Sequence, residues 1–273
     1  MSATPRPENR NSGAYRAGVH ELSQSVSRYE LWCFLGCQDI LLRYRRSILG
    51  PWWITLSTGI LVGALGLLWS RIFKIDIESY LPYFAIGQVL WTLISGIVTE
   101  SCLGFVQFEA LIKQVRLPYG AYILRIMVRH IIVLAHNLVI IVVVALLCRT
   151  QIGYVSLLAL PGIMIVLIGL YSLSICCAVI CTRYRDVVSI VASALNILYF
   201  LSPVMWLPEA LGERSGLLYF NPVYYWLLLC RDPLLGRTPP LEAWIAASGS
   251  SLVLVIVAIF LLGKSRDRIS YWI

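Results

Sequence analysis

The chain has 273 residues, of which 59% are hydrophobic and 13% are charged, and its formal net charge is +8. An ordinary globular domain carries about 25% charged residues, because a soluble fold needs a charged surface. The composition therefore excludes a cytosolic enzyme, a disordered regulator and a secreted disulfide scaffold. It predicts an all-α, polytopic membrane protein.

The N-terminal region is the most polar part of the chain. Residues 1–27 are polar and basic, and we expect them to form a cytoplasmic tail. In residues 28–46, apolar side chains fall near one helical face, which predicts an amphipathic helix in the inner membrane interface. Asp39 and Arg43 are four residues apart and can pair on this helix. The helix would serve either as a simple anchor or as a collar around a cytoplasmic entrance.

Three arginines, Arg43, Arg45 and Arg46, crowd the boundary between this helix and the first long apolar run. A guanidinium group binds phosphate through two parallel hydrogen bonds. These side chains could therefore bind the diphosphate of a lipid-linked substrate. The alternative is that they fix the topology and contact lipid headgroups.

Six uncharged runs approach or exceed the length of about 20 residues that crosses the hydrocarbon core. They cover residues 52–70, 79–99, 130–148, 150–182, 187–208 and 243–263. We expect six transmembrane helices, the fourth of them a single tilted helix over residues 154–181. The permease domain would then extend over residues 28–263, and residues 264–273 would form a second cytoplasmic tail.

A seventh uncharged run, at 215–230, is shorter and contains Asn221-Pro222. Proline removes a backbone donor and interrupts a helix. The surrounding segment, 207–240, is therefore predicted to form re-entrant helices on the periplasmic side rather than a crossing.

The distribution of basic residues sets the orientation of the helices. With six spans both termini lie on one side, and 16 of the 22 lysine and arginine residues lie on that side. The positive-inside rule then places both termini in the cytoplasm. Because the basic excess faces anionic lipid, it requires no nucleic-acid partner.

The loop at 102–118 carries a short amphipathic pattern. Phe105, Phe108 and Ile112 fall on one face, and Glu109 and Lys113 are spaced to form an ion pair. Such a helix suits docking into a groove on a soluble partner, although it could also be a second interfacial helix.

The sequence lacks residues that would bind ATP, couple transport to an ion gradient or catalyse a reaction. Gly263-Lys264-Ser265 imitates the end of a phosphate-binding loop, but Ala258 stands where that loop needs glycine. The apolar runs carry no acidic residue for ion coupling. The inner acids Glu100, Glu109 and Asp186 have no companion at working distance in the sequence. No catalytic residue, metal site or cofactor is therefore predicted, and ATP would have to be hydrolysed elsewhere.

Aromatic residues gather in and around the runs. Some belong to the aromatic belts of any membrane protein, whereas others could line a path for sugars, whose C–H faces stack on flat rings. The candidates for a channel are Trp52, Trp53, Tyr83, Phe84, Tyr199 and Phe200.

Five motifs resemble the permeases of ABC-type polysaccharide exporters of the O-antigen and lipopolysaccharide branch. They are RYRRSILGPWW at 43–53, LIKQVRLP at 111–118, RYRDV at 183–187 with SPVMW at 202–206, FNPVYYW at 220–226 and RDRISYWI at 266–273. The resemblance covers nearly all of residues 28–273. One departure is Leu117, where phenylalanine often precedes the proline.

The resemblance implies the membrane half of a transporter in the bacterial inner membrane. Two copies would form a homodimer, two ATP-binding cassette subunits would bind ATP-Mg beneath them, and a lipid-diphosphate-linked polysaccharide would leave between the copies. The coupling residues would be Phe105, Phe108, Glu109, Ile112 and Lys113. The outer gate would include Pro203, Asn221, Pro222, Tyr224 and Tyr225.

Three other functions stay open. The cargo could be capsule, teichoic acid or a drug instead of an O-antigen-like glycan. The chain could also be a multi-pass membrane transferase or hydrolase, or a structural scaffold subunit. An enzyme would turn over alone, whereas a permease needs an ATPase.

Overall fold

The structure is a computed structural model that describes residues 7–45, 47–50, 52–150, 153–209, 216 and 218–273, with side chains from residue 13 onward. The described residues form helices and no strands. The elements are α1 (Pro7–Ser27), α2 (Tyr29–Arg43), α3 (Trp52–Phe73), α4 (Ile77–Cys102), η1 (Val106–Phe108), α5 (Glu109–Gln114), α6 (Tyr119–Leu147), η2 (Tyr154–Leu158), α7 (Ala159–Arg183), α8 (Val187–Leu201), α9 (Pro222–Leu234) and α10 (Leu241–Trp272).

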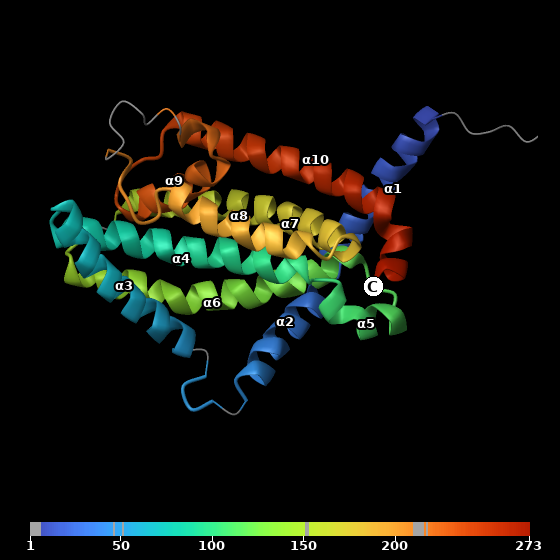
Figure 1. Ribbon diagram of the computed structural model, residues 1–273, viewed down its shortest axis with the longest axis horizontal. Helices are drawn as coiled ribbons and strands as arrows, with labels where there is room; N and C mark the ends of the chain where they lie inside the picture. The colour runs from blue at the N-terminus through green and yellow to red at the C-terminus, as the bar shows by residue number, and fades with distance from the viewer. Residues whose placement is uncertain (1–6, 46, 51, 151–152, 210–215, 217) are drawn as a thin grey trace, which may run out of the picture.

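Long apolar helices lie side by side in one bundle, and α2 and α3 project from its flank (Figure 1). Among the described residues, five helices are long and apolar enough to cross a membrane, namely α3, α4, α6, the continuous η2–α7 unit and α10. The fourth predicted run is therefore one helix, as expected. The chain is a multi-pass membrane protein.

The fifth predicted span is shorter than expected. Residues 187–208 were predicted to be one span, but α8 has 15 residues and ends at Leu201. At 1.5 Å per residue it is about 22 Å long, less than the hydrocarbon thickness of about 30 Å. Pro203 explains the early end, because proline disfavours helical backbone at the residue before it, and Ser202 is extended.

Two other boundaries differ from the prediction because charged residues sit inside helices. The third span was predicted to begin at residue 130, yet α6 begins at Tyr119 and includes Arg125 and Arg129. The tail at 264–273 is not separate either, since α10 continues to Trp272. A helix can therefore extend beyond an uncharged run, as α6 does where Arg125 and Arg129 are paired with acidic side chains.

The predicted N-terminal tail contains a helix, α1, which packs against α10. The crossing is close because it has glycine on both sides. A Cβ atom on Gly18 would collide with the carbonyl of Ile259, and one on Gly263 would collide with the carbonyl of Ala14. Residues 13–27 are therefore part of the fold.

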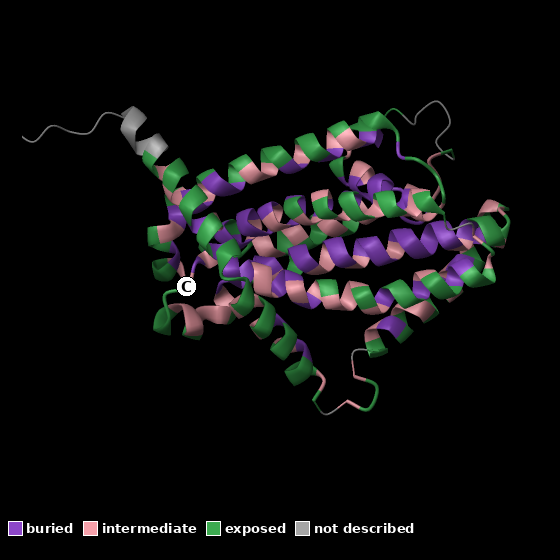
Figure 2. Ribbon diagram, turned by 180° about the vertical axis from the view of Figure 1, so that it is seen from behind, coloured by how far each residue is buried: buried purple, intermediate pink, exposed green. Residues whose placement is uncertain are grey.

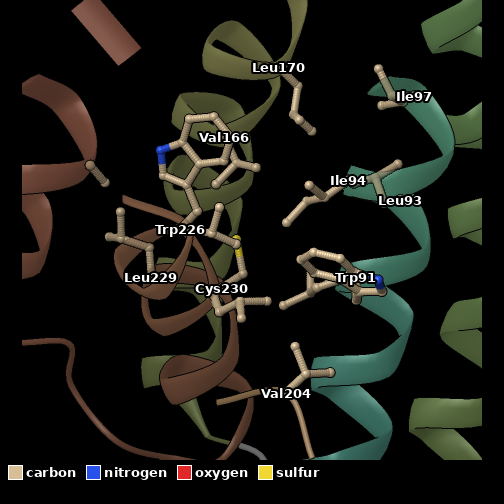
Figure 3. Close-up of a cluster of buried hydrophobic side chains, with 14 of the residues drawn as sticks. Trp91, Leu93, Ile94, Ile97, Val166, Leu170, Val204, Trp226, Leu229 and Cys230 are labelled. Carbon is tan, nitrogen blue, oxygen red and sulfur yellow. The ribbon is translucent and has the colours of Figure 1, made fainter. Parts of the chain in front are cut away.

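The centre of the bundle is α4. In its most apolar window 72% of residues are buried, against 22% for α3 and for α6, and Figure 2 shows α4 buried along most of its length. Figure 3 shows side chains of α9, including Trp226 and Cys230, pointing between Trp91 of α4 and Val166 of α7. The segment around α9 therefore inserts into the bundle core instead of lying over it.

Candidate functional site

Charged side chains from three helices meet at the end of the bundle where α4 finishes and α6 begins. We call this end the charged end, and we call the group the ionic cluster. Its members are Asp39 and Arg43 of α2, Glu100 of α4, and Arg125, Arg129 and His130 of α6.

Asp39 attaches α2 to α6. Arg125 binds it through both carboxylate oxygens, with Nε 2.7 Å from Oδ2 and Nη2 2.6 Å from Oδ1. Arg129 adds a third contact, from Nη1 to Oδ2 at 3.1 Å. The expected pair of Asp39 with Arg43 does not form, because Asp39 faces α6 and its oxygens are already bound there.

Glu100 holds the second half of the cluster. Its Oε1 lies 2.7 Å from Nη2 of Arg129, and its Oε2 lies 2.8 Å from Nε2 of His130. Arg43 reaches Oε1 at 3.4 Å. Arg129 therefore bridges the two carboxylates with only 8% of its side chain exposed. Charges buried this deeply persist only when they are paired.

The connection between α4 and α6, residues 103–118, lies directly on the cluster; we call it the coupling segment, after the role that the resemblance implies for it. The guanidinium of Arg125 lies 4.5 Å from the centre of the Phe108 ring, and that of Arg129 lies 5.9 Å from it. Both distances lie within the range of attraction between a cation and a ring face. Any displacement of Phe108 therefore acts on the ionic cluster.

The apolar face predicted for this segment points into the bundle. Phe105 is completely buried and contacts the ring of Tyr119 at 5.4 Å. Phe108 and Ile112 are partly buried against the same core. Glu109 and Lys113 pair at the exposed surface, as their spacing predicted. Surface available to a partner lies instead on the opposite face, which includes exposed Val115 and Arg116.

The predicted diphosphate-binding arginines are divided between two environments. Arg43 pairs with Glu100 while 48% of its side chain stays exposed. Arg45 is exposed, and Arg46 lies outside the described residues.

The six predicted channel aromatics do not share one surface within a single chain. Tyr83 and Phe84 are buried, whereas Trp52, Trp53 and Phe200 are exposed. Tyr199 donates a hydrogen bond to Oε1 of Gln88 at 2.8 Å and is partly buried.

A buried arginine fixes the opposite end of the bundle. Only 1% of Arg231 is exposed; its Nη1 donates to the carbonyl of Pro203 at 2.6 Å, and its guanidinium lies 3.9 Å from the ring of Tyr83. The Tyr83 hydroxyl donates to the carbonyls of Pro203 and Trp206, at 2.9 and 3.1 Å. These four residues form what we call the far-end clasp, which holds the chain after α8 against α4.

The remaining predicted gate residues surround the start of α9. Asn221 accepts a hydrogen bond from the backbone of Val223 at 3.0 Å, caps the helix and donates to Ser202 at 2.9 Å. Pro222 takes the first helical position, where a missing N–H costs nothing. The rings of Tyr224 and Tyr225 adjoin each other, 5.3 Å apart.

Sequence reasoning missed the partners of Glu100 and the role of Arg231. Glu100 has no companion within its own helix, and Arg231 was assigned to an outer loop. One signal was present: Arg125 and Arg129 are four residues apart, so they share a face if the helix begins at Pro118. Within the described ranges, no cluster of three histidine, cysteine or acidic residues could hold a metal ion.

Comparison with known families agrees with this architecture. The family model described as ABC-2 type transporter matches residues 30–234. The chain belongs to the ABC-2 type transporter family. The match runs from α2 to α9 and includes the ionic cluster, the coupling segment and the far-end clasp, whereas α1 and α10 lie outside it. A search of curated proteins finds no match. ABC-2 proteins are transporter permeases that normally work with ATP-binding subunits.

Replacing Asp39 with alanine should strongly destabilise this ABC-2 permease. The change removes the carboxylate that binds Arg125 and one of the two that bind Arg129, a type of loss that costs about 3–5 kcal/mol. Glu109→Ala is the control, because it removes an exposed pair worth about 0.3–0.5 kcal/mol. Denaturant unfolding of the purified chain measures both, and equal losses would refute a structural role for the cluster.

Replacing Arg231 with methionine should loosen the chain after α8. The Pro203 carbonyl then keeps only the Tyr83 hydroxyl as a donor and loses a hydrogen bond to a charged group, at a cost of about 1.5–3 kcal/mol. Hydrogen exchange should rise in residues 202–207. Arg237→Met, an exposed arginine just beyond the same helix, should leave that exchange unchanged, and similar exchange in both variants would contradict the clasp.

Proposed function

We propose that the chain is the membrane-spanning subunit of an ABC exporter for a lipid-diphosphate-linked polysaccharide of the O-antigen type. ATP would be hydrolysed by a separate subunit. The observation that carries the proposal is the contact of the Phe108 ring with the ionic cluster, in a chain that belongs to the ABC-2 family. Through that contact, one short segment reaches α2, α4 and α6 together.

The orientation follows from charge. The charged end would face the cytoplasm of a bacterial cell, with both termini on that side of the inner membrane. This arrangement gives the coupling segment access to a soluble ATPase. Its exposed face, around Lys113, Val115 and Arg116, would contact the partner.

A second copy would complete the transport path. None of the residues of α8 is buried, and its Ile190, Ile197 and Phe200 side chains are exposed. Such a short apolar helix suits a surface that another copy covers, and α8 would be the sixth crossing. The path would run between α3 and α8 of the two copies, lined by exposed aromatics such as Trp52 and Phe200.

The entrance would lie at the end of α2. Apolar Phe34 and Leu41 are exposed on α2, as in a helix that rests in the membrane interface. Arg45 is exposed just beyond its end, and Arg43 retains half its surface. These side chains would bind the diphosphate, and the re-entrant segment around α9 would gate the exit at the far-end clasp.

Other assignments receive less support. Capsule or teichoic acid precursors would use the same features, so the cargo class depends on the resemblance of the five motifs. A membrane transferase would need an available acid or base. Glu100 and His130 are instead bound to each other, and Arg129 occupies the second Glu100 oxygen.

The coupling surface can be tested without disturbing the core. Val115→Asp places a charge on the exposed face of the coupling segment and should lower export by about tenfold or more, because it desolvates a carboxylate in the partner interface. Val115→Thr keeps the shape and should export normally. The measurement is ATP-dependent transfer of lipid-linked glycan in proteoliposomes containing the co-purifying ATPase. Equal export by both variants would refute the proposed docking face.

Arg45→Gln should raise the substrate concentration needed for half-maximal export by about tenfold or more, whereas Arg45→Lys should raise it less. A charge-assisted contact to phosphate is worth about 1.5–3 kcal/mol, and lysine keeps the charge but not the bidentate geometry. Insertion and orientation are checked by protease protection. Unchanged half-maximal concentrations in both variants would leave Arg45 with a topological role only.

A further inference from the structure

The helix α1 carries a buried carboxylate that no part of the proposed mechanism uses. Only 8% of Glu21 is exposed, and Ser25, one turn further, is completely buried. Acidic side chains are rarely buried without a partner. Moreover, α1 lies outside residues 30–234, the region that matches the ABC-2 family model.

The partner of Glu21 is the beginning of α6. Its Oε1 accepts a hydrogen bond from the backbone N–H of Tyr119 at 2.8 Å. The first N–H groups of a helix have no partner within the helix, and its N-terminus carries a partial positive charge. Pro118, the residue that precedes α6, has no side chain that could cap it. Glu21 therefore caps α6 from a different helix.

A second contact holds α1 against the same turn. Gly120 follows Tyr119, and a Cβ atom there would collide with Ser25 of α1 and with the Tyr171 hydroxyl. On its other side α1 is held to α10 by the glycine crossing at Gly18 and Gly263. Arg266 of α10 also approaches Glu21, with Nη1 4.0 Å from Oε2. The position of Glu21 is thus fixed from both sides.

The place that Glu21 holds is the exit of the coupling segment. Tyr119 directly follows that segment, and its ring contacts the buried ring of Phe105 near the entrance of the segment. The segment is therefore anchored twice: at Phe108 by the ionic cluster, and at Tyr119 by α1. A segment fixed at two points passes a displacement on to the helices, whereas a flexible segment would change its own conformation instead.

We propose that Glu21 is a positioning residue for energy coupling. It caps α6 so that motion of the coupling segment reaches the transmembrane helices, with α1 and α10 as the support. This inference rests on the proposed function, since it assumes an ATP-driven partner at the coupling segment. It assigns α1, which lies within the region predicted to be a polar cytoplasmic tail, a part in coupling.

Three variants of the full chain test the role. Glu21→Ala removes the acceptor, Glu21→Gln keeps an acceptor without the charge, and Gln24→Ala is the control on the exposed face of the same helix. Hydrogen exchange of the chain in nanodiscs reports the cap, and glycan exported per ATP hydrolysed reports coupling. The second measurement uses the complex with the co-purifying ATPase.

Glu21→Ala should accelerate hydrogen exchange in residues 119–122 and lower the export per ATP by about tenfold. A change of this size corresponds to the free energy of one charge-assisted hydrogen bond. Glu21→Gln should fall between this variant and wild type, and Gln24→Ala should match wild type. Faster exchange with wild-type export per ATP would overturn the positioning role, because the cap would then be only structural.

Two further results are also decisive. If Glu21→Ala does not fold, Glu21→Gln carries the test, and wild-type exchange together with wild-type export per ATP in that variant overturns the inference. If the wild-type complex exports nothing in response to ATP, the proposed function fails. The inference about coupling then fails with it, while the exchange experiment still shows whether Glu21 caps α6.

Discussion

Asp39 and Glu100 bring two negative charges into the helix bundle at the point where Arg125 and Arg129 need them. Moving a charged group out of water is costly, and these ions are tolerated because several short contacts share the charge among α2, α4 and α6. The pairing lets α6 extend beyond the apolar run with two arginines on it. The charged end of the bundle depends on this arrangement.

The same pairing changes the role of α2. A helix held only by its apolar face would be free to shift, but Asp39 ties α2 to α6. Because Phe108 rests on the same two guanidiniums, the coupling segment and α2 share one set of contacts. In an ABC-2 permease, that shared contact would give a direct route from an ATP-driven partner to the substrate entrance proposed at the end of α2.

The sequence predicts the helical bundle well because length and apolarity decide which segments cross a membrane. It predicts less wherever tertiary contacts override composition. Arg125 and Arg129 looked like loop charges because their partners lie far away in the chain. The fold of α1 was missed because its glycine crossing with α10 has no local signature. Arg231 was assigned to the outer segment, since only the structure shows that it donates a hydrogen bond to the distant Pro203 carbonyl.

The two anchored ends leave a defined part of the molecule free to move. The ionic cluster and α1 fix α6 at the charged end, and the far-end clasp fixes the chain after α8 to α4. Between them, α8 has no buried residue and α3 buries only 22% of its most apolar window. Weakly packed helices rearrange at the lowest cost. A conformational change that opens a path is therefore expected to displace α3 and α8 around a rigid core of α4, α7 and α9.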